Sequence, residues 1–406
     1  MTGILSGLRV VEGSAFVAAP LAGMTLAQMG ADVIRFDRLQ GGLDYHRWPV
    51  TADNRSLFWA GLNKGKRSIA MDLASEEGRE LLQALICPDD PKQAAVFLTN
   101  LRIRGFLDYE ALSARRSDLI MMEIRGTRLG GPAVDYTVNP AVGFPDCTGP
   151  EDHDEPVAHV LPAWDCITGQ KAALGLLAAE RHWLRTGEGQ HATLALKDVA
   201  LSMLGNLGIL GEVDVNGVSR PKHGNALYGA YGEMFATADD RRVMVVALTR
   251  RQWKNLLDVT ASGEAMAALA DRLGRDFGQE GERFLARREI TSVLAPWFRA
   301  RRLAEIGPLF DDGGVTWGPF RNFAQARAED PDLSEDHPMF RLLDQPGIGQ
   351  YLVPGSPLDF TAAPRTDPVR APLLGEHTDM ILSEMGLPSG TIGTLHDKGI
   401  VASTKP

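Results

Sequence analysis

The chain has 406 residues, a net charge of −10 and a pI near 5.5, and charged residues make up 23% of it. This length exceeds what one compact core normally holds, so we expect two domains. The acidic balance argues against nucleic acid as the main partner, although a local cationic pocket could still bind an anionic small ligand.

Targeting and metal signals are absent from the sequence. The three cysteines, Cys87, Cys147 and Cys166, lack a metal-binding spacing and are typical of a reducing compartment. We find no signal-peptide pattern and no apolar run long enough to cross a membrane. We therefore expect a soluble cytoplasmic protein with no bound metal and no membrane partner.

Strand and helix patterns alternate through the first 200 residues. LRVVEG (8–13) is a β-branched run that predicts a buried strand, apolar residues at helical spacing follow up to Gly30, and DVIRFDR (32–38) predicts a second strand. Because consecutive parallel strands need a crossover helix, this order predicts an open, doubly wound (Rossmann-like) α/β sheet. Further elements are expected at SIAMDL, EEGRELLQALI, AAVFLTN and DLIMMEIRG.

The later part of the chain predicts a second domain. We assign residues 1–210 to the N-terminal part of a large α/β domain. Residues 225–330 contain one clear strand, VMVVAL (243–248), among helical patterns, and predict a smaller α/β domain. Residues 337–406 are rich in proline and glycine, and we expect them to complete the large domain.

Two segments follow the first two predicted strands, at the edge where open α/β sheets bind ligands. The loop GSAFVAAP (13–20) would offer helix-terminal amides to an anion, but it lacks the G-x-G-x-x-G pattern of dinucleotide enzymes. Asp37 and Arg38 end the second strand, where an arginine can bind a phosphate on an adenosine ribose. An ordinary tight loop and a solvated arginine remain the alternatives.

Two basic segments offer further candidates at the same edge. Lys64, Lys66 and Arg67 precede a predicted strand and could counter pyrophosphate charge. The segment TNLRIRG (99–105) places Asn100, Arg102 and Arg104 directly after a buried strand. A solvated charged face is the alternative for both.

Asp165 stands between an apolar run and a helix of small residues, in the stretch HVLPAWDCITGQKAALGLLAAERHWLRTGEGQ. It could be the N-cap of that helix, a contribution of about 1 kcal/mol. Helix-terminal amides would also favour its anionic form, and an ionised carboxylate can attack a thioester. The same amides could stabilise the oxyanion that develops during acyl transfer.

Several motifs in this order resemble the class III (formyl-CoA transferase-like) CoA-transferases along nearly the whole chain. They are LSGLRVVEGSAFVAAPLAGMTLAQMGADVIRFDR, NKGKRSI, WDCITGQKAALGLLAAERHWLRTGEGQ, GVTWGPF and APLLGEHTD. The resemblance implies that Asp165 is the nucleophile and that the fold is an interlaced, ring-shaped homodimer. It implies no metal or redox cofactor, because CoA arrives as part of the substrate.

The resemblance also assigns residues to the CoA path and to the acyl pocket. The residues implied to line the CoA path are Ala15, Phe16, Val17, Ala18, Arg38, Met71, Asn100, Leu101, Arg102 and Arg104. The stretches GSAFVAAPL, GGLDYHRWPVT, SLFWAGLNKGKRSIA, VDYTVNP and HVLPAWD resemble members that move CoA between the two carboxyl groups of one small dicarboxylic acid. Arg47, Tyr136 and Tyr228 are then candidates for holding the free dianion.

Other functions remain open from the sequence. Val134 and Asn255 stand where racemases of the family have a histidine and a glutamate, so proton removal lacks its base. An intermolecular transferase with succinyl-CoA or another donor is the main alternative. An NADP-binding oxidoreductase that uses Arg38, and a non-catalytic CoA-binding subunit, are further alternatives.

Overall fold

The computed structural model describes residues 3–102 and 104–404, which form two compact units. The first unit comprises Met1–Val142, Val160–Gly211 and Pro331–Pro406, and the second comprises Gly143–His159 and Glu212–Asp330. The segment 143–159, which the sequence analysis leaves in the large domain, thus belongs to the second unit.

The first unit is built on a seven-stranded sheet of order β12-β3-β2-β1-β4-β5-β6. All neighbours pair in parallel except β12, which is antiparallel to β3. The order β3-β2-β1-β4-β5-β6 is that of a doubly wound sheet, so the predicted fold class is confirmed. The strands are β1 (Arg9–Gly13), β2 (Asp32–Asp37), β3 (Arg67–Met71), β4 (Val96–Thr99), β5 (Ile120–Arg125), β6 (Gln190–Ala195) and β12 (Val401–Ala402).

Helices cover both faces of this sheet, so the central residues of its strands are mostly buried, including the charged side chains Glu12 of β1 and Arg35 of β2. Ile34, Phe97 and Leu82 belong to the core on one face, and Val33, Leu98 and Leu176 to the core on the other. The helices of this unit are α1 (Ala18–Gln28), α2 (Leu57–Leu62), α3 (Glu76–Ile86), α4 (Tyr109–Arg115), α5 (Asp135–Ala141), α6 (Ala163–Thr186), α7 (Leu196–Asn206), α15 (Thr378–Glu384) and α16 (Ser389–Asp397), while α8 (Ile209–Asn216) begins in this unit and ends in the second.

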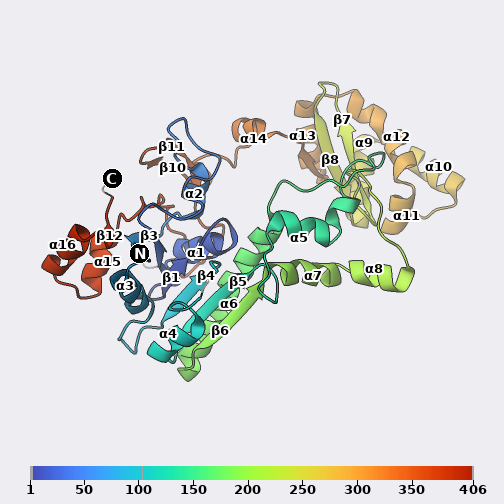
Figure 1. Cartoon of the computed structure of the whole chain (residues 1–406). Coiled ribbons are helices and arrows are strands. Elements are labelled where there is room, and N and C mark those ends of the chain that lie inside the picture. Colours follow the sequence, from blue (N-terminus) through green and yellow to red (C-terminus); the bar gives the residue numbers. More distant parts are fainter. Residues whose placement is uncertain (1–2, 103, 405–406) are drawn as a thin grey trace. The chain divides into compact units, whose positions relative to one another are not determined.

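The C-terminal segment returns to the N-terminal half of the sheet. Figure 1 shows α15 and α16, in red, beside β3 and α3, and Ile381 of α15 shares a core with Leu82 of α3. Val401 of β12 pairs with Met71 of β3. The segment also contains the hairpin β10 (Phe340–Gln345) and β11 (Gly349–Pro354).

Close packing holds the N-terminal part of α6 against the start of α1. A Cβ on Gly169 would lie 2.7 Å from the backbone oxygen of Ala18, so only glycine allows this approach. Ala172 and Ala173 continue the small-residue face and are buried. α6 ends at Thr186 and is followed by Gly187, whose φ of 74° is the left-handed conformation that commonly ends helices. The first turn of α6 is therefore held beside the loop that precedes α1.

The second unit has an antiparallel sheet of order β7-β8-β9 and its own aromatic core. The stacked rings of Phe235 and Phe298 have centroids 3.9 Å apart. The sequence predicted only the middle strand of this sheet. Its elements are the 3-10 turn Phe144–Cys147, β7 (Tyr231–Ala236), β8 (Arg242–Ala247), α9 (Arg250–Thr260), α10 (Gly263–Leu273), α11 (Glu280–Leu285), α12 (Arg287–Arg299), α13 (Leu303–Gly313), β9 (Thr316–Pro319) and α14 (Phe323–Glu329). In the described residues of both units, no helix combines the length and apolarity that a bilayer crossing needs.

Candidate active site

The candidate site lies in the first unit, where the strand order reverses between β1 and β4. Ligands of open α/β sheets bind at such a switch point, outside the carboxyl ends of the strands. The loop after β1 is fixed to the end of β4 by Asn100, whose Oδ1 accepts a hydrogen bond from the Ala15 amide (2.9 Å). The Asn100 Nδ2 donates in turn to the Ala15 carbonyl (2.7 Å).

Phe16, the next residue of this loop, has an unusual backbone conformation. Its φ is +64°, which L-residues other than glycine rarely adopt, and its amide donates to Asp44 Oδ2 (3.0 Å). The ring is 39% exposed, and the Arg47 guanidinium lies 5.4 Å from its centroid and 5.3 Å from that of Phe58. The loop therefore presents an aromatic surface with a cation above it.

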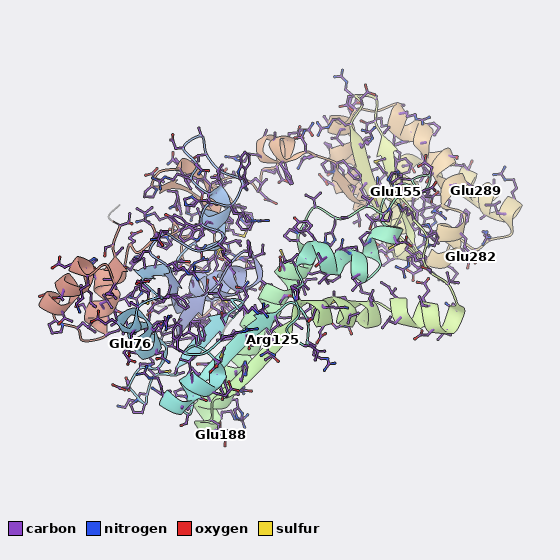
Figure 2. The ribbon with its side chains drawn as sticks, viewed as in Figure 1. Glu76, Arg125, Glu155, Glu188, Glu282 and Glu289 are labelled. Atoms are coloured by element: carbon purple, nitrogen blue, oxygen red, sulfur yellow. The ribbon has the colours of Figure 1, made fainter. Side chains whose placement is uncertain are left out.

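A cavity of about 420 Å³ opens beside this loop. Its lining comes from the β1–α1 loop, the ends of β4 and β5, and the first turns of α5 and α6. Figure 2 labels Arg125 at the end of β5, one of the two arginines in the lining. The lining residues that bear on function are Phe16, Val17, Ala18, Arg47, Asn100, Arg125, Val134, Asp135, Tyr136 and Asp165.

Asp165 lies in the first turn of α6, but it does not cap that helix. α6 begins at Ala163, and its N-cap position is taken by Pro162, so the N-cap prediction is wrong. In the described part of the chain, the Asp165 carboxylate takes part in no hydrogen bond or ion pair. Partial burial and the nearby charge of Asp135 raise its pKa to about 6, against the opposing effect of Arg47. The helix terminus was expected to favour the anionic form, but burial and Asp135 together disfavour it.

Asp135, which the sequence analysis did not single out, binds the amides at the start of α6. Its Oδ2 accepts from the amides of Trp164 (2.7 Å) and Asp165 (3.1 Å). The amide of Cys166 donates to the Pro162 carbonyl (3.0 Å). These amides are occupied, so the prediction that they stabilise an oxyanion is wrong for this conformation.

The start of α1 differs from that of α6. The amides of Val17, Ala18 and Ala19 make no hydrogen bond within the described residues, and the N-cap Val17 has no side-chain acceptor. Val17 and Ala18 line the same cavity as Asp165. The loop 13–20 thus leaves helix-terminal amides free, as expected, in the lining of the cavity that contains Asp165, and anion binding by them stays a prediction.

The other residues implied to line the CoA path have varied surroundings. Leu101 is half-buried, while Arg38, Arg102 and Arg104 are exposed, and Ile103 lies outside the described residues. Met71 is different, because its side chain has no exposed surface and belongs to the core under β12. In this structure Met71 therefore offers no surface to an adenosine.

The basic cluster before β3 serves the fold rather than an open phosphate site. Lys66 is buried and its Nζ contacts Glu12 Oε1 (2.8 Å). Arg67 pairs with Asp32 (2.6 Å), and the Lys64 Nζ donates to the Gly61 carbonyl (2.7 Å). The alternative of a solvated face is also wrong for the two lysines, which are both buried.

The two tyrosines proposed for the acyl pocket belong to different units. Tyr136 lines the Asp165 cavity and is 56% exposed. Tyr228 lies in the second unit, where its hydroxyl donates to Glu212 and the Arg220 guanidinium lies 3.9 Å from its ring centroid.

Within the described residues, no cluster of three or more histidine, cysteine, aspartate or glutamate side chains could hold a metal ion.

The cavity thus contains an unpaired carboxylate together with free helix-terminal amides. A nucleophile and fixed N–H donors are the groups that acyl transfer requires. Residues 5–378 match the CoA-transferase family III, and the chain belongs to that family. The resemblance predicted from the motifs is thereby confirmed.

The chain is similar to proteins of known name over nearly its whole length. The chain is 59% identical over 404 residues to 2-methylfumaryl-CoA isomerase of Chloroflexus aurantiacus, covering 99% of this chain and 98% of that protein. It is 29% identical over 409 residues to succinyl-CoA:mesaconate CoA-transferase of Haloarcula hispanica, covering 96% and 98%. The crystal structure of a CAIB/BAIF family protein from Brucella suis is similar with a TM-score of 0.76 and 28% identity, covering 95% and 100%.

Proposed function

We propose that the protein is an intramolecular CoA-transferase that moves CoA between the C1 and C4 carboxyl groups of 2-methylfumarate (mesaconate). The observation that carries this proposal is the 59% identity, over 99% of the chain, to an enzyme named 2-methylfumaryl-CoA isomerase. The site supports it, because Asp165 presents an unpaired carboxylate in a cavity of about 420 Å³. A cavity of this size suits a small acyl group.

The first half of the reaction transfers CoA to the protein. The Asp165 carboxylate attacks the C1 thioester carbonyl, and the C–S bond breaks to give a mixed anhydride and CoA thiolate. The thiolate then attacks the aspartyl carbonyl. This forms an Asp165–CoA thioester and releases mesaconate as a dianion that stays in the pocket.

The second half reverses these steps at the other carboxyl group. The C4 carboxylate attacks the Asp165 thioester and expels the thiolate, which then attacks the C4 carbonyl of the new anhydride. The Asp165 carboxylate is regenerated, and no proton, electron or metal is consumed. CoA itself, carried by the substrate, is the only group that the steps require.

Arg47 is our candidate for holding the free dianion. Its guanidinium has no ion-pair partner among the described residues, and it faces the cavity together with Tyr136. Arg125 lines the same cavity but is paired with Glu123 (2.7 Å). An unpaired arginine is suited to bind a carboxylate, so Arg47 would retain mesaconate while its ends exchange.

The amides of Val17 and Ala18 are our candidates for the oxyanion site. They line the cavity and lack a partner in the described part of the chain, whereas the amides of Trp164 and Asp165 are occupied. Fixed amides that point at developing negative charge commonly supply a large share of acyl-transfer catalysis.

An intermolecular transferase is the second candidate function. The relatives from Haloarcula that bear the name succinyl-CoA:mesaconate CoA-transferase favour it, at 29% identity. The test is incubation with mesaconyl-C1-CoA alone. Formation of mesaconyl-C4-CoA, with no incorporation of added isotope-labelled mesaconate, is expected for the intramolecular enzyme. Dependence on a free acid, or efficient incorporation of label, would contradict it.

We also propose a homodimer. The stretch 196–216, which contains α7 and α8, supports it, because α8 has no buried residue and apolar side chains are exposed along the two helices and between them. They include Leu201, Leu207, Leu210, Val213 and Val215. Exposed apolar patches of this kind commonly mark protein interfaces. Sedimentation analysis is expected to give twice the 44.0 kDa chain mass, and a monomer would contradict the proposal.

A further inference from the structure

The first turn of α5 is joined to the first turn of α6 by two polar side chains. Asp135, the first residue of α5, accepts hydrogen bonds from the amides of Trp164 (2.7 Å) and Asp165 (3.1 Å). Asn139, one turn later, accepts from the indole Nε1 of Trp164 (3.1 Å). Asp135 and Asn139 are 1% and 2% exposed, so this joint lies in the interior of the unit. α5 thus supplies the cap that α6 lacks.

α6 has no capping side chain of its own. Pro162 occupies the N-cap position and offers no side-chain acceptor. Asp165 is the third residue of the helix, a position from which an acidic side chain can reach back to the unpaired amides of the first turn. A carboxylate bound in that way would be less available for attack, because its lone pairs would be engaged.

We propose that Asp135 is a positioning residue, which binds the N-terminal amides of α6 in place of Asp165 and so keeps the Asp165 carboxylate free to attack the thioester. This inference rests on the proposed function of Asp165 as the nucleophile. It explains why two acidic residues lie together at one helix start, an arrangement that costs stability through the repulsion of their charges.

Asp135 also affects the basicity of Asp165. The charged groups that face Asp165 are Asp135, which raises its pKa, and Arg47, which lowers it. Cys166 lies beside it on α6 with a raised thiol pKa, and Arg125 lines the same cavity. A more basic carboxylate is a stronger nucleophile, so Asp135, second to burial, also contributes to the activation of Asp165.

Asp135→Asn separates the charge from the cap, because the amide oxygen can still accept from the two backbone amides. We expect the acid limb of kcat/KM to move about 0.5–1 pH unit lower, since a like charge is removed from Asp165. Asp135→Ala removes both effects and is expected to lower kcat about 10- to 100-fold, because the nucleophile is no longer held in place. Asp165 should still form its CoA adduct in Asp135→Asn.

Asn139→Ala is the matched control, because it removes the other half of the joint and leaves the carboxylate of Asp135 in place. It is expected to lower the thermal unfolding midpoint and to leave the acid limb unmoved. A folded Asp135→Ala enzyme with the wild-type kcat would overturn this inference, because α6 would then have lost its cap without any loss of attack by Asp165. Absence of the Asp165–CoA adduct in the wild-type enzyme would overturn the proposed function and, with it, this inference.

Discussion

Two clusters of charge lie near the ligand edge of the same sheet, and they differ in whether the charged side chains are paired. In one cluster Arg35 contacts Asp37 (2.9 Å) and Asp44 (2.8 Å), and Lys66 contacts Glu12 (2.8 Å), with every side chain at most 3% exposed. In the other, the Asp165 carboxylate is left without a partner in the described residues. Paired charges such as Arg35 and Asp44 hold the β1–α1 loop in place, whereas the unpaired Asp165 carboxylate is available to a ligand.

The paired cluster fixes the loop that lies beside the unpaired carboxylate. Asp44 accepts from the Phe16 amide, and Arg35 donates to the Ser14 carbonyl (3.2 Å). A buried ion pair contributes little net stability. It does hold its two side chains firmly in place, because separating them would leave a buried charge without a partner. The loop can therefore keep Phe16 in a strained conformation beside the cavity.

The largest expected effect comes from the unpaired charge. Asp165→Asn is expected to lower kcat by about 10³-fold or more, because the thioester intermediate can no longer form. Steady-state conversion of mesaconyl-C1-CoA measures this. Circular dichroism must show that the variant is folded. A folded variant with substantial activity would contradict the role of Asp165.

The paired cluster should respond in stability. Lys66→Met leaves the buried Glu12 carboxylate without its cation, so we expect the free energy of unfolding to fall by about 3–5 kcal/mol. The matched control is Lys254→Met, because Lys254 pairs with Asp258 on the exposed face of α9. That change should cost less than about 0.5 kcal/mol in urea unfolding. Equal losses would remove the distinction between the two clusters.

The same Asp165→Asn variant should be more stable than the wild type at pH 8. The pKa of Asp165 is raised in the folded state, so its ionisation has no effect on stability below its unfolded pKa, lowers stability increasingly as the pH rises to about 6, and has its full effect above that value. Removing the charge is expected to add about 1–2 kcal/mol at pH 8 and much less at pH 4.

Glu188→Gln is the matched control for this stability effect. Glu188 lies just beyond the other end of α6, as Figure 2 shows, and its side chain is 74% exposed. This change should alter the free energy of unfolding by less than about 0.5 kcal/mol. A stability gain in Asp165→Asn that is independent of pH would contradict the assignment to ionisation.

The smallest expected effect concerns pH dependence. kcat/KM is expected to fall on the acid side with an apparent pKa of about 6, because only the ionised Asp165 attacks. Arg47→Ala should move this limb about 0.5–1 pH unit higher, since a cation that favours the carboxylate is lost. Arg47→Lys keeps the charge and should leave the limb close to its wild-type position. An unmoved limb in Arg47→Ala would place Arg47 away from Asp165.

Local patterns were sufficient to predict much of the fold. The strands β1 to β5 and the helices α3 and α9 lie where β-branched runs and helical spacing place them. β12 has only two residues and pairs with β3, which is far away in the sequence, so no local pattern marks it. The segment 143–159 likewise belongs to the second unit through contacts that its own sequence does not show.

The site shows the same limit. The capping preference of aspartate favoured Asp165 as the N-cap, but a better-placed acceptor, Asp135, lies 30 residues before it in the chain. Lys66 was predicted as a phosphate ligand because its partner Glu12 is 54 residues away and cannot be recognised from the local sequence. The sequence predicts which charged residues lie near the sheet edge, but only the fold shows which of them are paired with another side chain.

The most direct test of the central claim is mass spectrometry of the wild-type enzyme quenched with hydroxylamine during turnover of mesaconyl-C1-CoA. Hydroxylamine cleaves an aspartyl thioester to a hydroxamate, so the peptide that contains Asp165 is expected to carry this modification only when substrate is present. The Asp165→Asn variant supplies the blank. An unmodified Asp165 peptide in an enzyme that is turning over, or a hydroxamate on a different residue, would contradict the account.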